Sequence, residues 1–167
     1  MLARISRPAA PKASRASTHR PKVSLVSDRL IYIEFMNGAL KGIRILVVED
    51  DADTRDLLKV LIETEDGAAT VTGSVPEALS AYDQFPPNVI VADIGMPDYN
   101  GYALIGRVRA RDRERGKIVP AIALTAFTTS IDRDTVLSAG FQVHMPKPFE
   151  PRRLISVIAD LAAKYPG

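Results

Sequence analysis

Residues 43–51 read IRILVVEDD, a run rich in β-branched apolar residues that ends in three acids. Such a run is typical of a strand buried on both faces, whose polar end leaves the core. The next stretch, residues 53–65, places four apolar side chains on one helical face: Leu57, Leu58, Leu61 and Ile62. A buried strand followed by an amphipathic helix begins a βαβ unit, so this stretch predicts an α/β fold.

The same alternation continues along the chain. Expected strands lie at residues 43–48, 69–72, 89–92, 118–124 and 141–144, and expected helices at residues 53–65, 74–85, 102–113, 131–139 and 151–164. Five strands alternating with five helices imply a doubly wound, five-stranded parallel sheet with right-handed crossovers and helices on both faces.

Polar residues mark the predicted helix ends. Asp51 or Asp53 is expected to cap the first helix, and Ser74 followed by Glu77 is a capping-box pattern for the second. Gly140 is the expected residue just beyond the fourth helix. These local signals agree with the boundaries that the alternation predicts.

The net charge of +2 is distributed unevenly. Residues 1–41 contain eight Lys or Arg against two acids, whereas the rest of the chain contains 14 basic and 18 acidic side chains. We therefore predict a basic, disordered N-terminal extension at residues 1–41 and one folded domain at residues 42–167. The mildly acidic balance of that domain argues against direct binding of nucleic acid.

The extension has three open interpretations. Residues 1–24 are rich in Ala, Ser, Pro and Arg and carry no acid, which is typical of a disordered tail and also fits an organellar transit peptide. Met36 begins MNGALKGIRILVVEDD, so residues 1–35 can also be upstream sequence read from a misplaced start codon. Peptides from residues 1–35 in the native protein would dismiss the last interpretation.

The composition excludes several classes of site. The chain has no Cys, which excludes disulfides, a thiol nucleophile and a thiolate metal site. No run of about 18 apolar residues is present, so we expect no membrane span, and the expected location is the cytoplasm.

Functional groups follow four of the five predicted strands. Glu49 and Asp50 follow the first strand, Asp93 the third, Thr125 the fourth and Lys147 the fifth. Each residue alone has an ordinary structural explanation, such as capping a helix or bonding the backbone. Ligands of doubly wound sheets bind beyond the carboxyl ends of the strands. The joint occurrence of these residues therefore predicts a single functional site at that edge.

Four motifs carry a resemblance to a known family: VVEDD at 47–51, VADIGMPDYNG at 91–101, ALTA at 123–126 and MPKPF at 145–149. Together they resemble the receiver domains of response regulators in two-component signalling, such as the chemotaxis response regulator. The similarity covers residues 42–165. It implies a flavodoxin-like fold with strand order 2-1-3-4-5, and a phosphoacceptor signalling domain rather than an enzyme.

The resemblance also implies roles for the residues of the metal site. Asp93 matches the phosphorylated aspartate, and Glu49 and Asp50 match the acidic pair that holds Mg²⁺. Asp50 would be a direct ligand, whereas Glu49 would act mainly through a bound water. Gly95 matches the position that lends its backbone carbonyl to the metal.

Further implied roles concern the phosphoryl group and the switch. Lys147 matches the ammonium that binds a phosphoryl oxygen, and a cis Lys147–Pro148 peptide is expected to aim it at Asp93. Thr125 matches the switch hydroxyl. Pro97 and Gly101 are expected to shape the loop after Asp93.

The chemistry of these residue types agrees with the implied roles. Clustered carboxylates repel one another unless a cation is present, and Mg²⁺ prefers hard oxygen ligands. A carboxylate such as that of Asp93 can attack phosphorus to form an acyl phosphate. The added charge and acceptor oxygens then offer Thr125 a new hydrogen bond, which would pull on the loop that follows.

Two positions deserve separate expectations. His144 stands where these receivers commonly carry Tyr or Phe as the rotating switch ring, so we predict weaker coupling to Thr125; the alternative is a half-buried His at the strand end. Gly95 and the small Ala126 leave the phosphoryl group accessible to water, so we expect a short to moderate lifetime of the acyl phosphate.

The resemblance implies a histidine kinase or histidine phosphotransfer protein as phosphodonor, and a downstream effector that it does not identify. The chain stops at Gly167, soon after the final helix, so we expect a stand-alone receiver; a phosphorelay intermediate and a piece of a hybrid kinase are the alternatives. The sequence does not decide between a monomer and a homodimer. Partner docking is expected on helix 131–139, the strand through His144 and the final helix.

Three rival functions use the same residues or the same fold class. A Mg²⁺-dependent phosphohydrolase would use Asp93 as nucleophile, but it lacks a second acid two residues later. A flavin or nucleotide binder would need a phosphate-binding loop where Glu49 and Asp50 repel phosphate. A degenerate receiver would lack some of the acids, Thr or Lys, all of which are present.

A basic run at residues 107–117 is interpreted as a solvated helix end.

Overall fold

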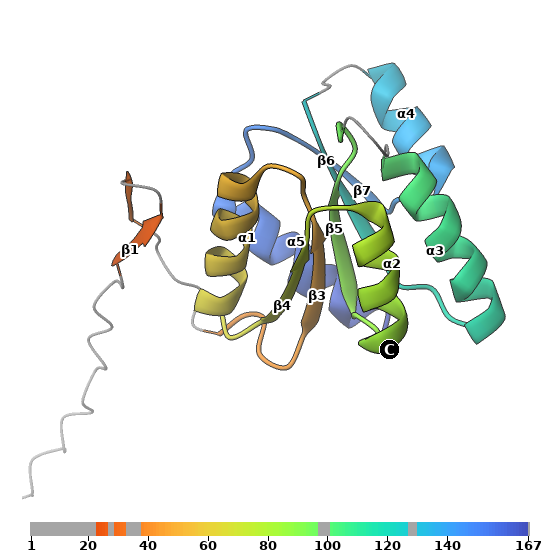
Figure 1. The fold of residues 1–167 in the computed structure, drawn as a ribbon, viewed down its shortest axis with the longest axis horizontal. Coiled ribbons are helices and arrows are strands. Elements are labelled where there is room, and N and C mark those ends of the chain that lie inside the picture. Colours follow the sequence, from red (N-terminus) through yellow and green to blue (C-terminus); the bar gives the residue numbers. More distant parts are fainter. Residues whose placement is uncertain (1–22, 27–28, 33–37, 97–100, 127–129, 167) are drawn as a thin grey trace, which may run out of the picture.

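The computed structural model describes residues 23–26, 29–32, 38–96, 101–126 and 130–166. Its centre is a five-stranded parallel sheet with strand order β4-β3-β5-β6-β7 (Figure 1). These strands are β3 (Arg44–Val48), β4 (Ala68–Thr72), β5 (Val89–Asp93), β6 (Ala121–Thr125) and β7 (Val143–Pro146). Numbered within the domain, this order is 2-1-3-4-5, so the predicted flavodoxin-like topology is confirmed.

Within the described residues, five helices cover both faces of the sheet (Figure 1). They are α1 (Ala52–Thr64), α2 (Val75–Gln84), α3 (Gly101–Arg115), α4 (Ser130–Ala139) and α5 (Pro151–Lys164). Helices α1 and α5 pack on one face, and α2, α3 and α4 pack on the other. The predicted doubly wound arrangement is therefore confirmed.

Each central strand supplies apolar side chains to both faces. In β3, Ile45 and Val47 pack toward α1 and α5, whereas Leu46 and Val48 pack toward α2 and α3. Every residue of β5 and β6 is buried. A strand covered on both sides needs apolar residues at successive positions, which is why these strands read as continuous apolar runs.

Two strands begin at least two residues later than predicted. The last strand was expected at residues 141–144 but runs over Val143–Pro146, because Phe141 lies in the turn after α4, where its amide donates to the Val136 carbonyl. The fourth strand begins at Ala121 rather than residue 118. Ile118 is exposed, and the Val119 amide donates to the Asp112 side chain instead of to a strand.

The predicted caps are present. Asp51 caps α1 by accepting a 2.8 Å hydrogen bond from the Thr54 amide. Ser74 caps α2, and the Glu77 carboxylate accepts a 3.1 Å hydrogen bond from the Gly73 amide. Gly140, just beyond α4, has a φ of +116°, a conformation that favours glycine.

Part of the predicted N-terminal extension is described. Residues 1–22, 27–28 and 33–37 lie outside the described residues, and β1 (Val23–Val26) pairs antiparallel with β2 (Arg29–Tyr32). Leu40 is buried in the core, and the carboxylate of the buried Glu65 accepts hydrogen bonds from the Gly38 and Ala39 amides. The domain start at residue 42 stays a prediction.

Among the described residues, no helix has the length and apolar character needed to cross a bilayer.

A buried carboxylate joins α2 to α3. Asp112 is 2% exposed and accepts hydrogen bonds from the Tyr82 hydroxyl, the Arg109 guanidinium and the Val119 amide. Arg109 also donates to the Gly140 carbonyl at 2.7 Å. We call Tyr82, Arg109 and Asp112 the Asp112 network. The basic run was expected to be a solvated helix end, and this interpretation is wrong for Arg109, whose charge is paired inside the fold.

Candidate functional site

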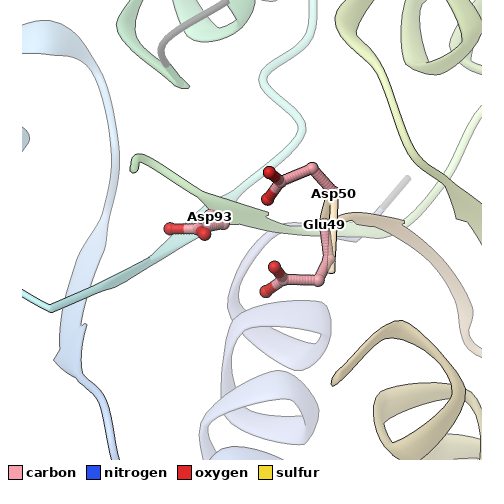
Figure 2. Close-up of side chains that lie close together, drawn as sticks. All are labelled: Glu49, Asp50 and Asp93. Carbon is pink, nitrogen blue, oxygen red and sulfur yellow. The ribbon is translucent and has the colours of Figure 1, made fainter. Parts of the chain in front are cut away.

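Three acids meet at the carboxyl end of the sheet. Glu49 and Asp50 follow β3, and Asp93 ends β5, the strand that pairs with β3. Figure 2 shows the three side chains directed toward a common space, and one oxygen from each lies within 4.8 Å of the others. Parallel pairing places the ends of β3 and β5 side by side, which explains how residues 43 positions apart meet.

The three acids differ in burial. Glu49 is 1% exposed and Asp93 is 8% exposed, whereas Asp50 lies open to solvent. The Glu49 amide donates to the Thr72 carbonyl at 3.1 Å, and its carboxylate accepts from the Asp51 amide at 3.3 Å. Glu49 is therefore fixed by its backbone and its side chain, and Asp50 forms the open side.

Lys147 reaches this cluster from the segment after β7. Its ammonium nitrogen lies 2.8 Å from Oε2 of Glu49 and 3.1 Å from Oδ2 of Asp93. The structure thus brings together four residues that the sequence predicted for one site. We call Glu49, Asp50, Asp93 and Lys147 the rim site.

Burial and charge shift two pKa values at the rim site. Burial raises the pKa of Glu49 above its ordinary value, although Lys147 acts in the opposite direction through a hydrogen bond and its charge. Burial opposes the charged form of Lys147, but hydrogen bonds to Glu49 and Asp93 outweigh it and raise the Lys147 pKa. Both shifts follow from placing ionisable groups partly out of water beside one another.

The donor set fits a hard divalent cation. One ammonium faces three carboxylates, so the ionised rim site carries excess negative charge. Carboxylate oxygens close together, with one side open to water, are the environment that Mg²⁺ prefers. Glu49, Asp50 and Asp93 could therefore hold a metal ion.

Asp93 is held in a defined orientation. Its Oδ1 accepts a 2.8 Å hydrogen bond from the Gly95 amide, and its Oδ2 accepts one from Lys147. Gly95 is exposed, and a Cβ built there would lie 3.5 Å from Oδ1. A side chain at position 95 would therefore stand beside the carboxylate. The metal-binding role of the Gly95 carbonyl stays a prediction.

Thr125 and His144 lie on the two strands next to Asp93. Thr125 is fully buried at the end of β6, and its carbonyl accepts a 2.7 Å hydrogen bond from the Lys147 amide. His144 is half-buried within β7, and its Nε2 is buried without a hydrogen-bond partner in the part of the chain that the structure describes. The switch roles of both residues stay predictions.

The loops around the rim site are described in part. The Lys147–Pro148 peptide is cis, as expected, and Ala126 is exposed beyond the end of β6. Pro97 lies outside the described residues. Gly101 begins α3 against β5, where a Cβ would lie 2.9 Å from the Asp93 carbonyl oxygen. Gly101 therefore permits a close approach of backbone to backbone beside Asp93.

One residue that lies next to the rim site was not predicted from the sequence. Arg55, in the first turns of α1, donates through one terminal nitrogen to the carbonyls of Glu49 at 2.7 Å and Asp50 at 3.2 Å. An Arg one helical turn after a run of acids was the available signal. It is also what any solvated helix presents, so sequence alone could not separate the two.

Comparisons with known proteins agree with this geometry. A family model described as the response regulator receiver domain matches residues 45–159. An uncharacterized 14.6 kDa protein from Leptolyngbya boryana is 42% identical over 122 residues, which are 73% of this chain and 92% of that protein.

Two further similarities extend the comparison. The DNA-binding response regulator MtrA of Mycobacterium tuberculosis is 33% identical over 113 residues, 68% of this chain, and the matched region spans only 47% of MtrA. The solved receiver domain of the Francisella response regulator 1452 superposes with a TM-score of 0.68 at 26% identity, covering 74% of this chain and 98% of that domain.

Proposed function

The chain belongs to the response regulator receiver domain family of two-component signalling, and we propose that it accepts a phosphoryl group on Asp93 with the help of Mg²⁺. The observation that carries this proposal is the rim site itself. Lys147 contacts both Glu49 and Asp93 where three carboxylates gather at the sheet edge.

The proposed step is an in-line transfer from a phosphohistidine. An oxygen of the Asp93 carboxylate attacks phosphorus, a phosphorus–oxygen bond forms, and the phosphorus–nitrogen bond of the donor breaks. The imidazole nitrogen leaves with the bonding electron pair, and the product is an aspartyl phosphate. The Lys147 ammonium, 3.1 Å from Oδ2 of Asp93, offers fixed positive charge to the phosphoryl oxygens.

The acids would hold the metal beside the nucleophile. Glu49, Asp50, Asp93 and the backbone carbonyl of Gly95 are the proposed ligands, with Glu49 acting mainly through water. When bound, Mg²⁺ offsets the repulsion between the incoming phosphate and the carboxylate. Asp93 is the proposed nucleophile because its carboxylate is oriented by both Gly95 and Lys147.

The proposed output runs through the neighbouring strands. A phosphoryl group on Asp93 brings new acceptor oxygens to the edge where β6 ends, and Thr125 would turn toward one of them. His144, on β7, would respond in place of an aromatic switch ring. The docking surface proposed for a downstream effector comprises α4, β7 and α5.

The proposed donor is a histidine kinase or a histidine phosphotransfer protein. We propose that the receiver works as a stand-alone module in the cytoplasm, that it performs no enzymatic turnover beyond loss of its own phosphoryl group, and that its folded domain does not bind nucleic acid directly. MtrA, about twice as long as the region it shares with this chain, is named as DNA-binding. That name belongs to the whole of MtrA.

Intact mass spectrometry tests this function. The full chain is incubated with acetyl phosphate and Mg²⁺, and the expected result is a mass increase of one phosphoryl group that disappears in Asp93→Ala. Asp160→Ala, which removes an exposed acid of α5, is the matched control and should keep the increase. Phosphorylation of Asp93→Ala equal to the wild type would refute the proposal. Consumption of the phosphodonor faster than the phosphorylated protein loses its phosphoryl group would favour a phosphohydrolase.

A further inference from the structure

We propose that Arg55 is a positioning residue for the acidic pair, holding Glu49 and Asp50 in the geometry that binds the metal. This inference rests on the proposed function, because it deepens the account of the same site. In the part of the chain that the structure describes, the Arg55 guanidinium donates to backbone carbonyls and makes no hydrogen bond to Asp93. It acts on the backbone that carries two of the three acids.

The contacts of Arg55 join α1 to the segment after β3. One guanidinium nitrogen donates to the Glu49 carbonyl at 2.7 Å and to the Asp50 carbonyl at 3.2 Å. The Arg55 amide donates to the Asp51 carbonyl at 2.9 Å, so the residue sits in a capped helical turn. Arg55 is half-buried, and hydrogen bonds from a charged donor are stronger than those between neutral groups.

Gly73 leaves the space that the guanidinium occupies. A Cβ built at Gly73 would lie 3.0 Å from the same Arg55 nitrogen and 3.6 Å from the guanidinium carbon. The Gly73 amide is held by the Glu77 carboxylate at 3.1 Å. The loop between β4 and α2 thus lies against the Arg55 guanidinium.

Two effects of Arg55 on Mg²⁺ binding oppose each other. Its hydrogen bonds fix the carbonyls of both acids, which favours a single arrangement of their carboxylates. Its positive charge beside the acids disfavours a second cation, although partial exposure to water screens that effect. Changes to residues that orient metal ligands typically cost about 10–100-fold in metal affinity. We expect the orienting effect to win, at the lower end of that range, because Lys147 and Thr72 also hold Glu49.

Calorimetric titration of the full-length protein with Mg²⁺ measures the effect directly. Arg55→Lys keeps the charge and loses the planar fork, so it isolates geometry from charge. We expect Mg²⁺ affinity to fall about fivefold in Arg55→Lys and about tenfold in Arg55→Met. Arg113→Lys, at an exposed position of α3, is the matched control and should leave the affinity unchanged. Thermal unfolding without Mg²⁺ checks that each variant is folded.

A second variant tests whether Arg55 affects Mg²⁺ binding through its hydrogen bonds to the carbonyls of Glu49 and Asp50. Gly73→Ala should push the guanidinium aside and weaken Mg²⁺ binding about threefold in the wild-type background. In the Arg55→Met background the same change should have no further effect, because nothing is left to displace. A role of Arg55 in folding alone would leave the two changes additive.

Kinetics with acetyl phosphate supply a second readout. In the Arg55 variants the Mg²⁺ concentration for half-maximal phosphorylation should rise, whereas the maximal rate at saturating Mg²⁺ should recover. Mg²⁺ affinities within twofold of wild type in both Arg55 variants would overturn the inference, as would tighter binding by Arg55→Met. If the wild type binds Mg²⁺ but takes no phosphoryl group, the proposed function fails while the role of Arg55 can still be read by calorimetry.

Discussion

The Asp112 network and the rim site both hold buried carboxylates, but the charge around those carboxylates differs. In the Asp112 network, one carboxylate meets one guanidinium, a hydroxyl and an amide, so its charge and its hydrogen bonds are both satisfied. In the rim site, one ammonium contacts two of three carboxylates, and the Asp50 side is open to solvent. The first arrangement is closed and stabilises the fold. The second leaves negative charge that a bound cation could balance.

The comparison shows that burial of an acid does not itself identify a functional site. Asp112 and Glu49 are equally buried, at 2% and 1% exposure. What separates them is the balance of charge around each. An unbalanced group of acids at the end of a sheet costs stability in the empty protein, and that cost is recovered when a ligand binds.

Removing Asp112 should produce the largest loss of stability. Asp112→Ala leaves the largely buried Arg109 without the carboxylate that pairs with its charge, and breaking a buried ion pair in this way typically costs about 3–5 kcal/mol. Chemical denaturation measures the change. Asp83→Ala removes exposed pairs with Arg111 and Arg115 and should cost less than about 1 kcal/mol. Equal losses in the two variants would contradict the idea of a closed network.

Mg²⁺ should stabilise the rim site and depend on its acids. At a concentration 100 times its Kd, a ligand that binds only the folded state adds about 2.7 kcal/mol. The melting temperature of the wild type should therefore rise with Mg²⁺, and that of Asp50→Asn should not. The Asp83→Ala protein should respond like the wild type. An Mg²⁺ response unaffected by loss of Asp50 would place the metal elsewhere.

The backbone beside Asp93 should tolerate little added volume. In Gly101→Ala the new methyl would lie 2.9 Å from the Asp93 carbonyl oxygen and 3.0 Å from Cα of Ile94, neither of which can swing away. We expect a loss of about 1–3 kcal/mol. Gly106→Ala lies in the same helix with open space around it and should gain about 0.5–1 kcal/mol. Denaturation of both variants measures the contrast, and equal effects would contradict it.

A larger side chain at position 95 should slow loss of the phosphoryl group. Because a Cβ at Gly95 would stand 3.5 Å from Oδ1 of Asp93, Gly95→Met should shield the acyl phosphate from water. We expect about threefold slower hydrolysis, the equivalent of roughly 0.7 kcal/mol in barrier height. Decay of the phosphorylated mass at fixed Mg²⁺ gives the rate. An unchanged or faster decay would show that water enters by another route.

The smallest expected effect concerns His144. A Tyr at this position should couple to Thr125 more strongly, so His144→Tyr should raise the affinity of the phosphorylated form for its effector about twofold, or roughly 0.4 kcal/mol. The comparison of phosphorylated and unphosphorylated protein in a binding assay isolates the coupling. An affinity equal to that of the wild type would refute weaker coupling through His144.

Most of the fold followed from the sequence because its strands are buried on both faces. Continuous apolar runs and local caps such as Asp51 and Ser74 identified the elements, and the resemblance supplied the strand order. The boundary near Phe141 was wrong because an apolar residue packs equally well in a turn above the core as in a strand. The hydrogen bond from the Phe141 amide to the Val136 carbonyl places this residue in the turn, and a pattern of side chains does not reveal that bond.

The residues of the rim site that contribute side-chain functional groups could be predicted from the sequence. Glu49, Asp93 and Lys147 were found because parallel strands bring their ends to one edge. Arg55 was missed because it acts through backbone carbonyls, which carry no sequence signature. Arg109 was wrongly expected to be solvated. Its partners include the Gly140 carbonyl, and tertiary packing rather than spacing along α3 brings them to it.

The most direct test of the central claim is to locate the phosphoryl group itself. The protein is phosphorylated with acetyl phosphate and Mg²⁺, reduced with borohydride, which converts an aspartyl phosphate to homoserine, and mapped by peptide mass spectrometry. The account predicts homoserine at position 93, and none without Mg²⁺. Homoserine at Asp50 or at another acid, or at position 93 without any divalent cation, would contradict it.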